Sequence, residues 1–322
     1  MDTDRQFYLK MSLLIATSFF IWYFGSYNKQ ENSLENSQIL PIKDKPAALE
    51  NFVPPTLVLF KDSESILPKR NWSIPPLELQ AEAAIAVKLD GSRTYYNKNI
   101  NEHRKIASIT KLMTAIVVLE HYNLDDIVTI SKKDIKREGS MGDLRTGETM
   151  TVRSLLNVML IDSSNDAATA LADQRQDFIS LMNKKAKELN LLNTNFTNPD
   201  GLDEGNNYSS ALDVSKMFSY LINNHKEILE ILKIKNSVVY SSDGKVEHRL
   251  LNTNELLGVV PEVKAGKTGY TDNAGESLTL LISGLYPNSS HNDIITVVLN
   301  SSDRFKESEK LIQWLEEAYI FN

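Results

Sequence analysis

Residues 105–121, KIASITKLMTAIVVLEH, place a serine and a lysine just before a long apolar run. Ser108 and Lys111 are three residues apart, so a helical turn puts both side chains on one face. A serine is a weak nucleophile until a base takes its proton, and a lysine serves as that base when burial or a nearby cation lowers its pKa. The free N–H groups at a helix N-terminus also favour a developing oxyanion. This stretch therefore predicts a serine nucleophile, activated by a lysine, at the start of a buried helix.

The same Ser-x-x-Lys spacing occurs twice more, at Ser26 with Lys29 and at Ser242 with Lys245. For any one of the three, a helix-capping serine followed by a solvated lysine is the plainer interpretation. Ser26 ends an apolar span and Ser242 lies in an Asp-Gly turn, whereas Ser108 precedes a buried helix. The context therefore favours Ser108 as the nucleophile.

Two further polar motifs follow along the chain. Residues 163–165, Ser-Ser-Asn, lie between two apolar segments, where a hydroxyl and an amide could relay a proton to a leaving amine and bind a substrate amide. Residues 267–269, Lys-Thr-Gly, lie on a predicted strand. There the lysine supplies positive potential for a substrate carboxylate, the threonine hydroxyl binds that carboxylate, and the glycine lets a ligand backbone approach. Taken singly, the first motif is more simply a helix cap and the second a solvent-facing strand end.

The three motifs occur together, in this order, in penicillin-binding proteins and class A β-lactamases. On these motifs the sequence resembles the low-molecular-mass penicillin-binding proteins, the serine D-Ala-D-Ala carboxypeptidases of the S11 peptidase type. The resemblance covers about residues 80–302 and includes whole blocks around the motifs, at residues 82–115, 144–173, 196–217 and 252–278. We therefore expect the fold and the chemistry of that family.

The resemblance implies a role for each matching residue. Ser108 would be the acylated nucleophile and Lys111 its general base. Ser163 and Asn165 would assist proton transfer and bind the substrate amide. Lys267 would stay charged, and the substrate-binding set that recognises the terminal carboxylate would be Lys267, Thr268, Gly269 and Tyr270. The backbone N–H groups of Ser108 and Tyr270 would form the oxyanion hole.

The pattern of apolar segments predicts an α+β fold. Strands are expected at residues 83–89, 92–96, 263–267, 277–283 and 294–300, with an Asp-Gly turn between the first two. Helices are expected at residues 112–121, 152–159, 165–171, 178–189 and 304–319; in the fourth, Lys184, Lys185 and Lys187 would face outward. This order gives an antiparallel five-stranded sheet flanked by helices, with a mostly helical inserted region. Together with the resemblance, it predicts a β-lactamase/transpeptidase-like fold.

Composition excludes several other classes of protein. The 322 residues, 42% of them hydrophobic, are enough for a full core. The net charge of −7 argues against nucleic-acid binding, which normally needs a basic surplus. Because the sequence has no cysteine, a disulfide framework, a cysteine nucleophile and an iron–sulfur cluster are excluded. The five histidines are scattered without an HExxH motif, so we expect neither a metal nor another cofactor.

The N-terminal segment is expected to lie in a membrane. Residues 11–28 carry no charge and follow Arg5 and Lys10. As a helix they would span about 27 Å, close to a hydrocarbon core of ~30 Å. The residues after Phe24 form a poor cleavage site, which favours a retained anchor over a cleaved signal peptide.

This organisation divides the chain into four regions. They are a cytoplasmic N-terminus at 1–10, a single-pass transmembrane signal anchor at 11–28, a proline-rich tether at 29–77 with a possible short strand at 56–60, and a penicillin-binding D,D-peptidase domain at 78–322. The domain would then lie outside the cytoplasm, on the cell membrane. Carboxypeptidases of the family can carry a β-rich C-terminal domain and a terminal membrane helix, whereas this chain ends about twenty residues after its last predicted strand. The N-terminal span would replace that anchor.

The resemblance implies an exported carboxypeptidase that removes the terminal D-alanine of peptidoglycan pentapeptide stems and is acylated by β-lactams. A D,D-endopeptidase that cuts cross-links stays open, because that branch typically lacks the C-terminal domain. A class A-like β-lactamase would need Glu-x-x-x-Asn to activate a water, but Ala186 and Leu189 stand four residues before Asn190 and Asn193. A non-catalytic β-lactam sensor would have no need of the intact lysines.

Overall fold

The computed structural model describes residues 68–136, 142–285 and 293–320. Every described residue belongs to one compact unit. The predicted cytoplasmic terminus, membrane segment and strand at 56–60, together with most of the tether, lie outside the described residues. Within the described part, no helix has both the length and the apolar character needed to cross a bilayer.

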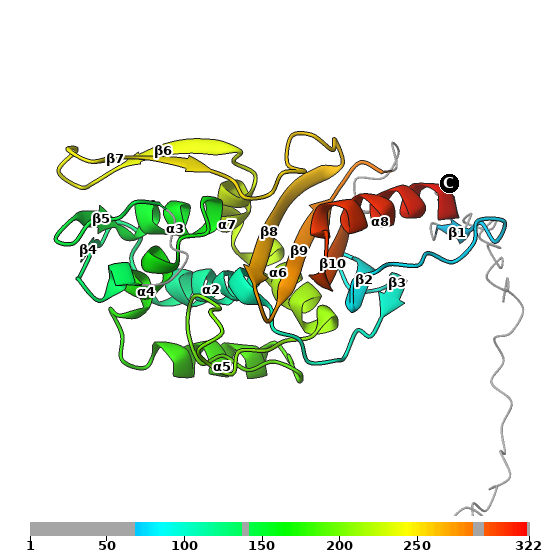
Figure 1. The fold of residues 1–322 in the computed structure, drawn as a ribbon, viewed down its shortest axis with the longest axis horizontal. Helices are drawn as coiled ribbons and strands as arrows, with labels where there is room; N and C mark the ends of the chain where they lie inside the picture. The colour runs from blue at the N-terminus through cyan, green and yellow to red at the C-terminus, as the bar shows by residue number, and fades with distance from the viewer. Residues whose placement is uncertain (1–67, 137–141, 286–292, 321–322) are drawn as a thin grey trace, which may run out of the picture. The chain divides into compact units, whose positions relative to one another are not determined.

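The centre of the described unit is a five-stranded antiparallel sheet with the order β3-β2-β10-β9-β8 (Figure 1). Its strands are β2 Ala83–Lys88, β3 Thr94–Lys98, β8 Val263–Thr271, β9 Gly275–Ile282 and β10 Ile294–Ser301. All five strands were predicted and all pair antiparallel, which confirms the predicted fold class. β8 continues past the predicted end at residue 267, because its ladder with β9 runs on to Thr271. The Lys-Thr-Gly motif therefore lies wholly within an edge strand.

Both faces of the sheet are buried, because successive side chains of a strand point to opposite faces. On β2, Ile85 belongs to the hydrophobic cluster that contains α6 (Ala211–Asn224). Its neighbours Ala84 and Ala86 belong to the cluster that contains α8 (Arg304–Ala318), drawn in red in Figure 1. A strand covered on both sides is apolar throughout, which explains why this segment shows no alternation of polar residues.

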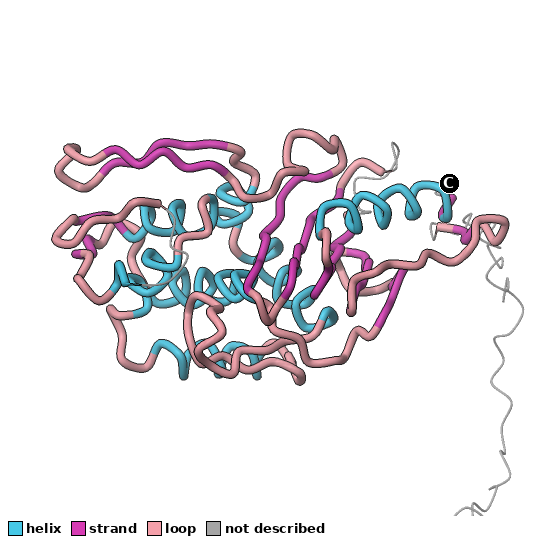
Figure 2. Tube along the Cα trace, in the orientation of Figure 1, coloured by secondary structure: helices cyan, strands magenta, loops and turns pink. Residues whose placement is uncertain are grey.

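Most of the other helices gather beside the sheet (Figure 2). They are α2 Lys111–His121, α3 Val152–Ile161, α4 Asn165–Ala172, α5 Phe178–Glu188 and α7 Lys226–Leu232. α2 to α5 and α8 match the predicted helices to within two residues at each end. Helices α6 and α7 were not predicted. The inserted region is therefore mostly helical, as the sequence indicated.

The lysines of α5 do not all face outward. Lys184 and Lys187 are exposed, as predicted. Lys185 instead forms an ion pair with Glu120 of α2 at 2.7 Å, and only 14% of its side chain is exposed. A charged residue at the border of an apolar face can meet a partner on the next helix, and spacing within one helix does not reveal that partner.

Short two-stranded ladders and turns complete the unit. They are β1 Lys69–Arg70 with β11 Tyr319–Ile320, β4 Ile127–Thr129 with β5 Thr149–Thr151, β6 Asn236–Tyr240 with β7 Glu247–Leu251, and the 3-10 turns η1 Ala107–Thr110 and η2 Asp134–Lys136. The β6–β7 hairpin was not predicted as a hairpin, although the Asp-Gly turn after Ser242 is the signal for it.

Candidate active site

Ser108 lies in η1, a 3-10 turn that leads directly into α2. Ala107 before it has a positive φ of 45°, a left-handed conformation that is uncommon for any residue except glycine. The prediction that Ser108 opens the helix is therefore corrected: α2 begins at Lys111, and the turn in front of it presents the serine. The other residues of η1 are buried, whereas Ser108 lines a pocket.

Lys111 is fully buried beneath the serine. Its Nζ donates to Ser108 Oγ at 2.7 Å and to Asn165 Oδ1 at 2.7 Å. It also donates to the backbone carbonyl of Asp200 at 2.8 Å. The Ser-x-x-Lys spacing thus brings hydroxyl and amine together as predicted, and residues of two other segments complete the surroundings of the amine.

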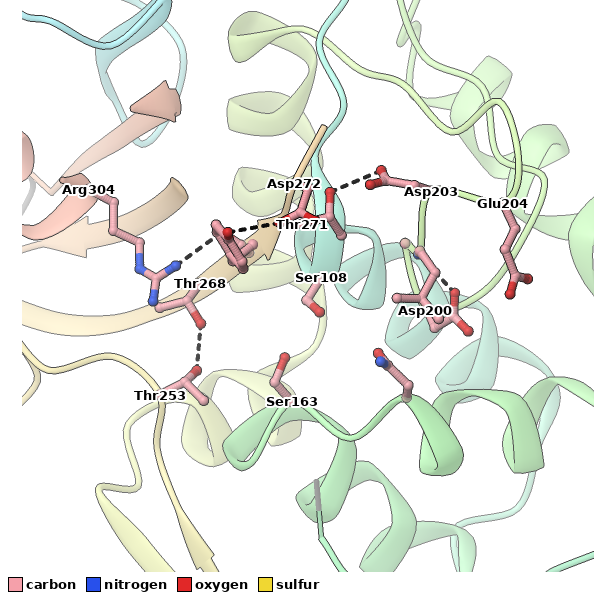
Figure 3. A pocket seen from close by; sticks show the side chains of 15 residues that line it. Ser108, Ser163, Asp200, Asp203, Glu204, Thr253, Thr268, Thr271, Asp272 and Arg304 are labelled. Carbon is pink, nitrogen blue, oxygen red and sulfur yellow. Dashed lines mark hydrogen bonds between the residues drawn. The ribbon is translucent and has the colours of Figure 1, made fainter. Parts of the chain in front are cut away.

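The Ser-Ser-Asn motif divides its two serines between different tasks. Ser164 is the N-cap of α4, where its Oγ accepts a hydrogen bond from Ala167 N at 3.2 Å. Ser163, with a positive φ of 62°, lines the pocket beside Ser108 (Figure 3). Its Oγ accepts a hydrogen bond from Lys267 Nζ at 2.8 Å. The helix-cap interpretation is correct for Ser164, and it leaves Ser163 and Asn165 directed toward the nucleophile.

Gly269 lets the edge strand β8 run directly beside the nucleophile turn. A Cβ at this position would lie 2.7 Å from the carbonyl oxygen of Ile106 and 3.2 Å from the backbone N of Ser108. Any larger residue would push the strand away from the Ser108 N–H. Tyr270, the next residue, is 59% exposed and its hydroxyl donates to Asp272 at 3.0 Å. The strand therefore presents its backbone beside the serine.

Lys267 is buried among positive charges. Burial, followed by the charges of Lys111 and Arg304, holds the pKa of Lys267 well below its ordinary value. Desolvation opposes the ammonium form, so the charge that is expected on Lys267 stays a prediction. A carboxylate bound beside it would favour that form again.

The pocket over Ser108 has a volume of about 450 Å³ and is polarised. Figure 3 shows Arg304, Thr268 and Thr253 on one side of Ser108 and Asp203 with Glu204 on the other. A peptide with a terminal carboxylate would direct that group toward the arginine and the two hydroxyls.

Sequence reasoning missed Arg304 and Thr253. Arg304 begins α8 and donates from Nη1 to the carbonyl of Gly269 at 3.2 Å. Thr253 follows β7, and its Oγ1 lies 2.5 Å from Oγ1 of Thr268. Arg304 stood at the first position of a predicted helix, where a cation is unfavourable to the helix dipole. The unfavourable position could have indicated that Arg304 has another role, whereas nothing in the sequence around Thr253 indicated a place in the site.

The other two Ser-x-x-Lys pairs form no comparable site. Ser26 and Lys29 lie outside the described residues. Ser242 lies in the turn of the β6–β7 hairpin, and Lys245 is 81% exposed and paired with Asp243 at 3.0 Å. In the part of the chain that the structure describes, no group of three histidine, aspartate or glutamate residues is placed to hold a metal ion.

The sequence profile of the D-alanyl-D-alanine carboxypeptidase family, peptidase family S11, matches residues 70–303, which include all three motifs. The chain belongs to this family. It is 37% identical over 209 residues to D-alanyl-D-alanine carboxypeptidase DacF of Bacillus subtilis, which covers 62% of this chain and 53% of DacF. It is also 31% identical over 217 residues to a D-alanyl-D-alanine endopeptidase of Haemophilus influenzae, which covers 65% of this chain and 73% of that protein.

A solved structure of the family shares the fold. The Streptomyces K15 DD-transpeptidase superimposes with a TM-score of 0.69 at 29% identity, over 75% of this chain and 98% of that one. The chain spans between about half and three-fifths of the length of three curated carboxypeptidases that it matches, at 53%, 61% and 59%. The S11 fold is therefore present, and the family match over residues 70–303 includes the site.

Proposed function

We propose that this S11 protein is a serine D-Ala-D-Ala carboxypeptidase that removes the terminal D-alanine from peptidoglycan pentapeptide stems. The observation that carries the proposal is the pair of contacts in one pocket, Lys111 with Ser108 at 2.7 Å and Lys267 with Ser163 at 2.8 Å. The first pairs a nucleophile with a base, and the second places a hydroxyl where a leaving group needs a proton.

Acylation begins with Lys111 in its neutral form. The amine takes the proton of the Ser108 hydroxyl while Oγ attacks the carbonyl carbon of the penultimate D-alanine. The backbone N–H groups of Ser108 and Tyr270 stabilise the negative charge that develops on the carbonyl oxygen. Asn165 binds the substrate amide and holds the stem beside β8.

The leaving group departs when the C–N bond breaks. The proton taken from Ser108 passes by way of Ser163 to the nitrogen of the departing D-alanine, and Lys111 is neutral again. A water then gives its proton to Lys111 and attacks the ester carbonyl. The ester C–O bond breaks, Ser108 recovers the proton, and the shortened stem is released.

The terminal carboxylate of the substrate is recognised at the opposite end of the pocket from Asp203 and Glu204. Lys267, Thr268 and Arg304 supply two cationic groups and a hydroxyl there, and Gly269 allows the approach of the substrate backbone. Because burial lowers the pKa of Lys267, a bound carboxylate also stabilises the proton on this lysine.

Cleavage of cross-links is the second candidate activity. It is favoured by the match to the Haemophilus influenzae endopeptidase, which covers 73% of that protein, against 53% of DacF. Both activities use the same acyl-enzyme. They differ in the leaving group on the nitrogen side of the scissile bond, which is a free D-alanine for the carboxypeptidase and a cross-linked stem for the endopeptidase.

The purified full-length protein should be incubated with a mixture of muropeptides and the products weighed by mass spectrometry. A carboxypeptidase converts pentapeptide monomers to species lighter by one alanine and leaves dimers intact. Breakdown of dimers into monomers would instead assign the endopeptidase activity. If neither change occurs while Ser108 still reacts with penicillin, hydrolysis of these stems is not the function.

The same proposal includes placement and inhibition. Residues 11–28 anchor the protein in the cell membrane, 29–77 form a tether, and 78–322 form the D,D-peptidase domain outside the cytoplasm, where peptidoglycan is found. β-Lactams acylate Ser108 as substrate mimics. N-terminal sequencing of the mature protein tests the anchor, because a first residue between Gly25 and Lys29 would mean that the segment is cleaved.

A further inference from the structure

The backbone carbonyl of Asp200 contributes to the surroundings of Lys111 in a way that no side-chain motif reveals. Lys111 Nζ contacts the oxygens of Asn165, Asp200 and Ser108. An amide oxygen and a carbonyl oxygen only accept hydrogen bonds, whereas a serine hydroxyl can also donate. A neutral amine has two N–H groups and one lone pair, so its N–H groups go to the two acceptors. The lone pair then points at Ser108, and the position of the Asp200 carbonyl helps to set its direction.

A half-buried amide, that of Asn198, holds this carbonyl in place. Asn198 Oδ1 accepts from Gly201 N at 2.9 Å, and its Nδ2 donates to the carbonyl of Leu202 at 2.9 Å. These two backbone groups follow Asp200 directly, so one side chain fixes the exit of the loop. On the other side, Thr114 of α2 donates to the carbonyl of Pro199 at 2.6 Å. Neighbouring carbonyls at 199 and 200 are thus tied to the helix that carries Lys111.

A second amide holds the first. Asn207 is only 2% exposed, and its Nδ2 donates to Asn198 Oδ1 at 2.6 Å. Its Oδ1 accepts from the backbone N of Thr197 at 2.6 Å and of Asn198 at 3.2 Å. The two amides therefore form a continuous chain of hydrogen bonds that ends beside Asp200. Neither residue is among those that line the pocket.

The loop has little freedom to move without disturbing the nucleophile. Gly201 has a φ of +90°, and a Cβ there would lie 1.9 Å from the carbonyl oxygen of Ala107. The loop and the turn that presents Ser108 are therefore in direct backbone contact. A shift of the loop changes the position of the Asp200 carbonyl relative to both Lys111 and Ser108.

We propose that Asn198 and Asn207 are positioning residues that hold the Asp200 carbonyl against Lys111 and so aim the lysine lone pair at Ser108. This inference rests on the proposed function, in which Lys111 is the base. The two asparagines touch neither the substrate nor the reacting atoms, and they act only through the carbonyl between them and the lysine.

Asn198→Asp and Asn207→Asp test the inference, because each keeps the size and one acceptor oxygen of the amide but loses its N–H donor. In each variant the new carboxylate oxygen faces another oxygen, so the loop must shift. We expect the second-order rate of Ser108 acylation by a fluorescent penicillin to fall about 100-fold, as for a misplacement of about 1 Å. Relative to Asn183→Asp, which adds the same charge, we also expect the acidic limb of the pH profile to move to lower pH by about half a unit or more, because the ammonium form of Lys111 loses an acceptor.

Asn183→Asp is the matched control. Asn183 also ties this segment down, since it donates to the carbonyl of Phe196 at 2.7 Å and accepts from Phe196 N at 2.9 Å, but it does not flank Asp200. It should lower the melting temperature by a similar amount and leave the pH profile unchanged. Thr114→Val, which keeps the side-chain shape, should move the profile in the same direction as the asparagine variants and serves if those do not fold.

The outcomes separate the two proposals. The asparagine variants or Thr114→Val could have a lower melting temperature and yet the same pH profile as the wild type. In that case these residues are merely structural and the inference is wrong. If Asn183→Asp shifts the profile equally, the effect is not specific to Asp200 and the inference is also wrong. If Ser108 of the wild type is not acylated at all, the proposed function fails first.

Discussion

Lys267 Nζ lies 2.8 Å from Ser163 Oγ, so a strand at the edge of the sheet reaches a turn between two helices 104 residues earlier in the chain. Because Lys111 contacts Ser108 and Lys267 contacts Ser163, each lysine is paired with its own hydroxyl. The proposed function gives these two lysines different tasks on the basis of their positions.

The nucleophile is predicted to be Ser108 alone. Ser108→Ala should abolish covalent labelling by a fluorescent penicillin, because the acyl-enzyme cannot form without the hydroxyl. Ser242→Ala and Ser26→Ala, which alter the other Ser-x-x-Lys pairs, should be labelled like the wild type. Labelling is measured by in-gel fluorescence. A labelled band that persists in Ser108→Ala would exclude this assignment.

The two lysines are predicted to respond differently to replacement by arginine. Lys111→Arg keeps the charge but cannot release a proton, so acylation should fall by about three orders of magnitude or more. Lys267→Arg keeps a cation near the carboxylate site and should lose less. Acylation rates are measured for a peptide mimic with a free carboxylate and for its amide, and Lys267→Arg should reduce the preference for the free acid.

Two results would contradict the proposed division of tasks between Lys111 and Lys267. It is wrong if Lys111→Arg is acylated as fast as the wild type. It is equally wrong if Lys267→Arg proves the slower of the two variants with both peptides.

The buried Lys267 is predicted to make stability depend on pH. Its pKa is lowered in the folded protein by burial and by the charges of Lys111 and Arg304, so the unfolded chain binds an extra proton between the folded pKa and about 10. Wild-type stability should therefore rise with pH in that window, by up to about 1.4 kcal/mol per pH unit from this group. Lys267→Met lacks the titrating group, so its stability advantage should be largest at the acid end of the window and shrink as the pH rises.

Lys264→Met is the control for this effect, because Lys264 lies on the same strand but is exposed. Denaturant unfolding at a series of pH values measures each difference. A stability difference between wild type and Lys267→Met that grows with pH would contradict the argument.

The β6–β7 hairpin is predicted to depend on one buried pair. His248 Nε2 lies 2.5 Å from the Glu148 carboxylate and Nδ1 lies 2.8 Å from the carbonyl of Gly142, with 1% and 2% of the two side chains exposed. His248→Ala leaves the carboxylate buried without this partner and should cost about 3–5 kcal/mol of unfolding free energy.

Arg249→Ala removes a neighbouring ion pair, between Arg249 and Glu247, in which the arginine side chain is 84% exposed. Solvent screens that pair, so the variant should lose far less stability than His248→Ala. Urea unfolding followed by circular dichroism compares the two. Equal losses would mean that the His248–Glu148 pair does not anchor the hairpin.

The sequence predicted the sheet well because strands buried on both faces are marked by short, nearly continuous apolar runs. It did not predict α6 and α7, although α6 packs against β2 and β10. The helical pattern also predicted that Lys185 faces outward, which is wrong, because it pairs with Glu120 of another helix. The two errors have different causes. Helix α6 carries local signals, with Ser210 as its N-cap and Asp213 in its first turn, whereas the partner of Lys185 is distant in the sequence.

For the site, the sequence by itself determined the pair Ser108 and Lys111, because residues three apart share one face of a helical turn and the apolar run after Ser108 marks such a turn. It also named Ser163, Asn165 and Lys267 through their motifs. Only the tertiary structure decided that Lys267 meets Ser163, that Arg304 and Thr253 join the pocket, and that the Asp200 carbonyl faces Lys111. The reason is physical: a backbone carbonyl is present at every residue, and its position is set by the packing of loop against helix, which no local spacing encodes.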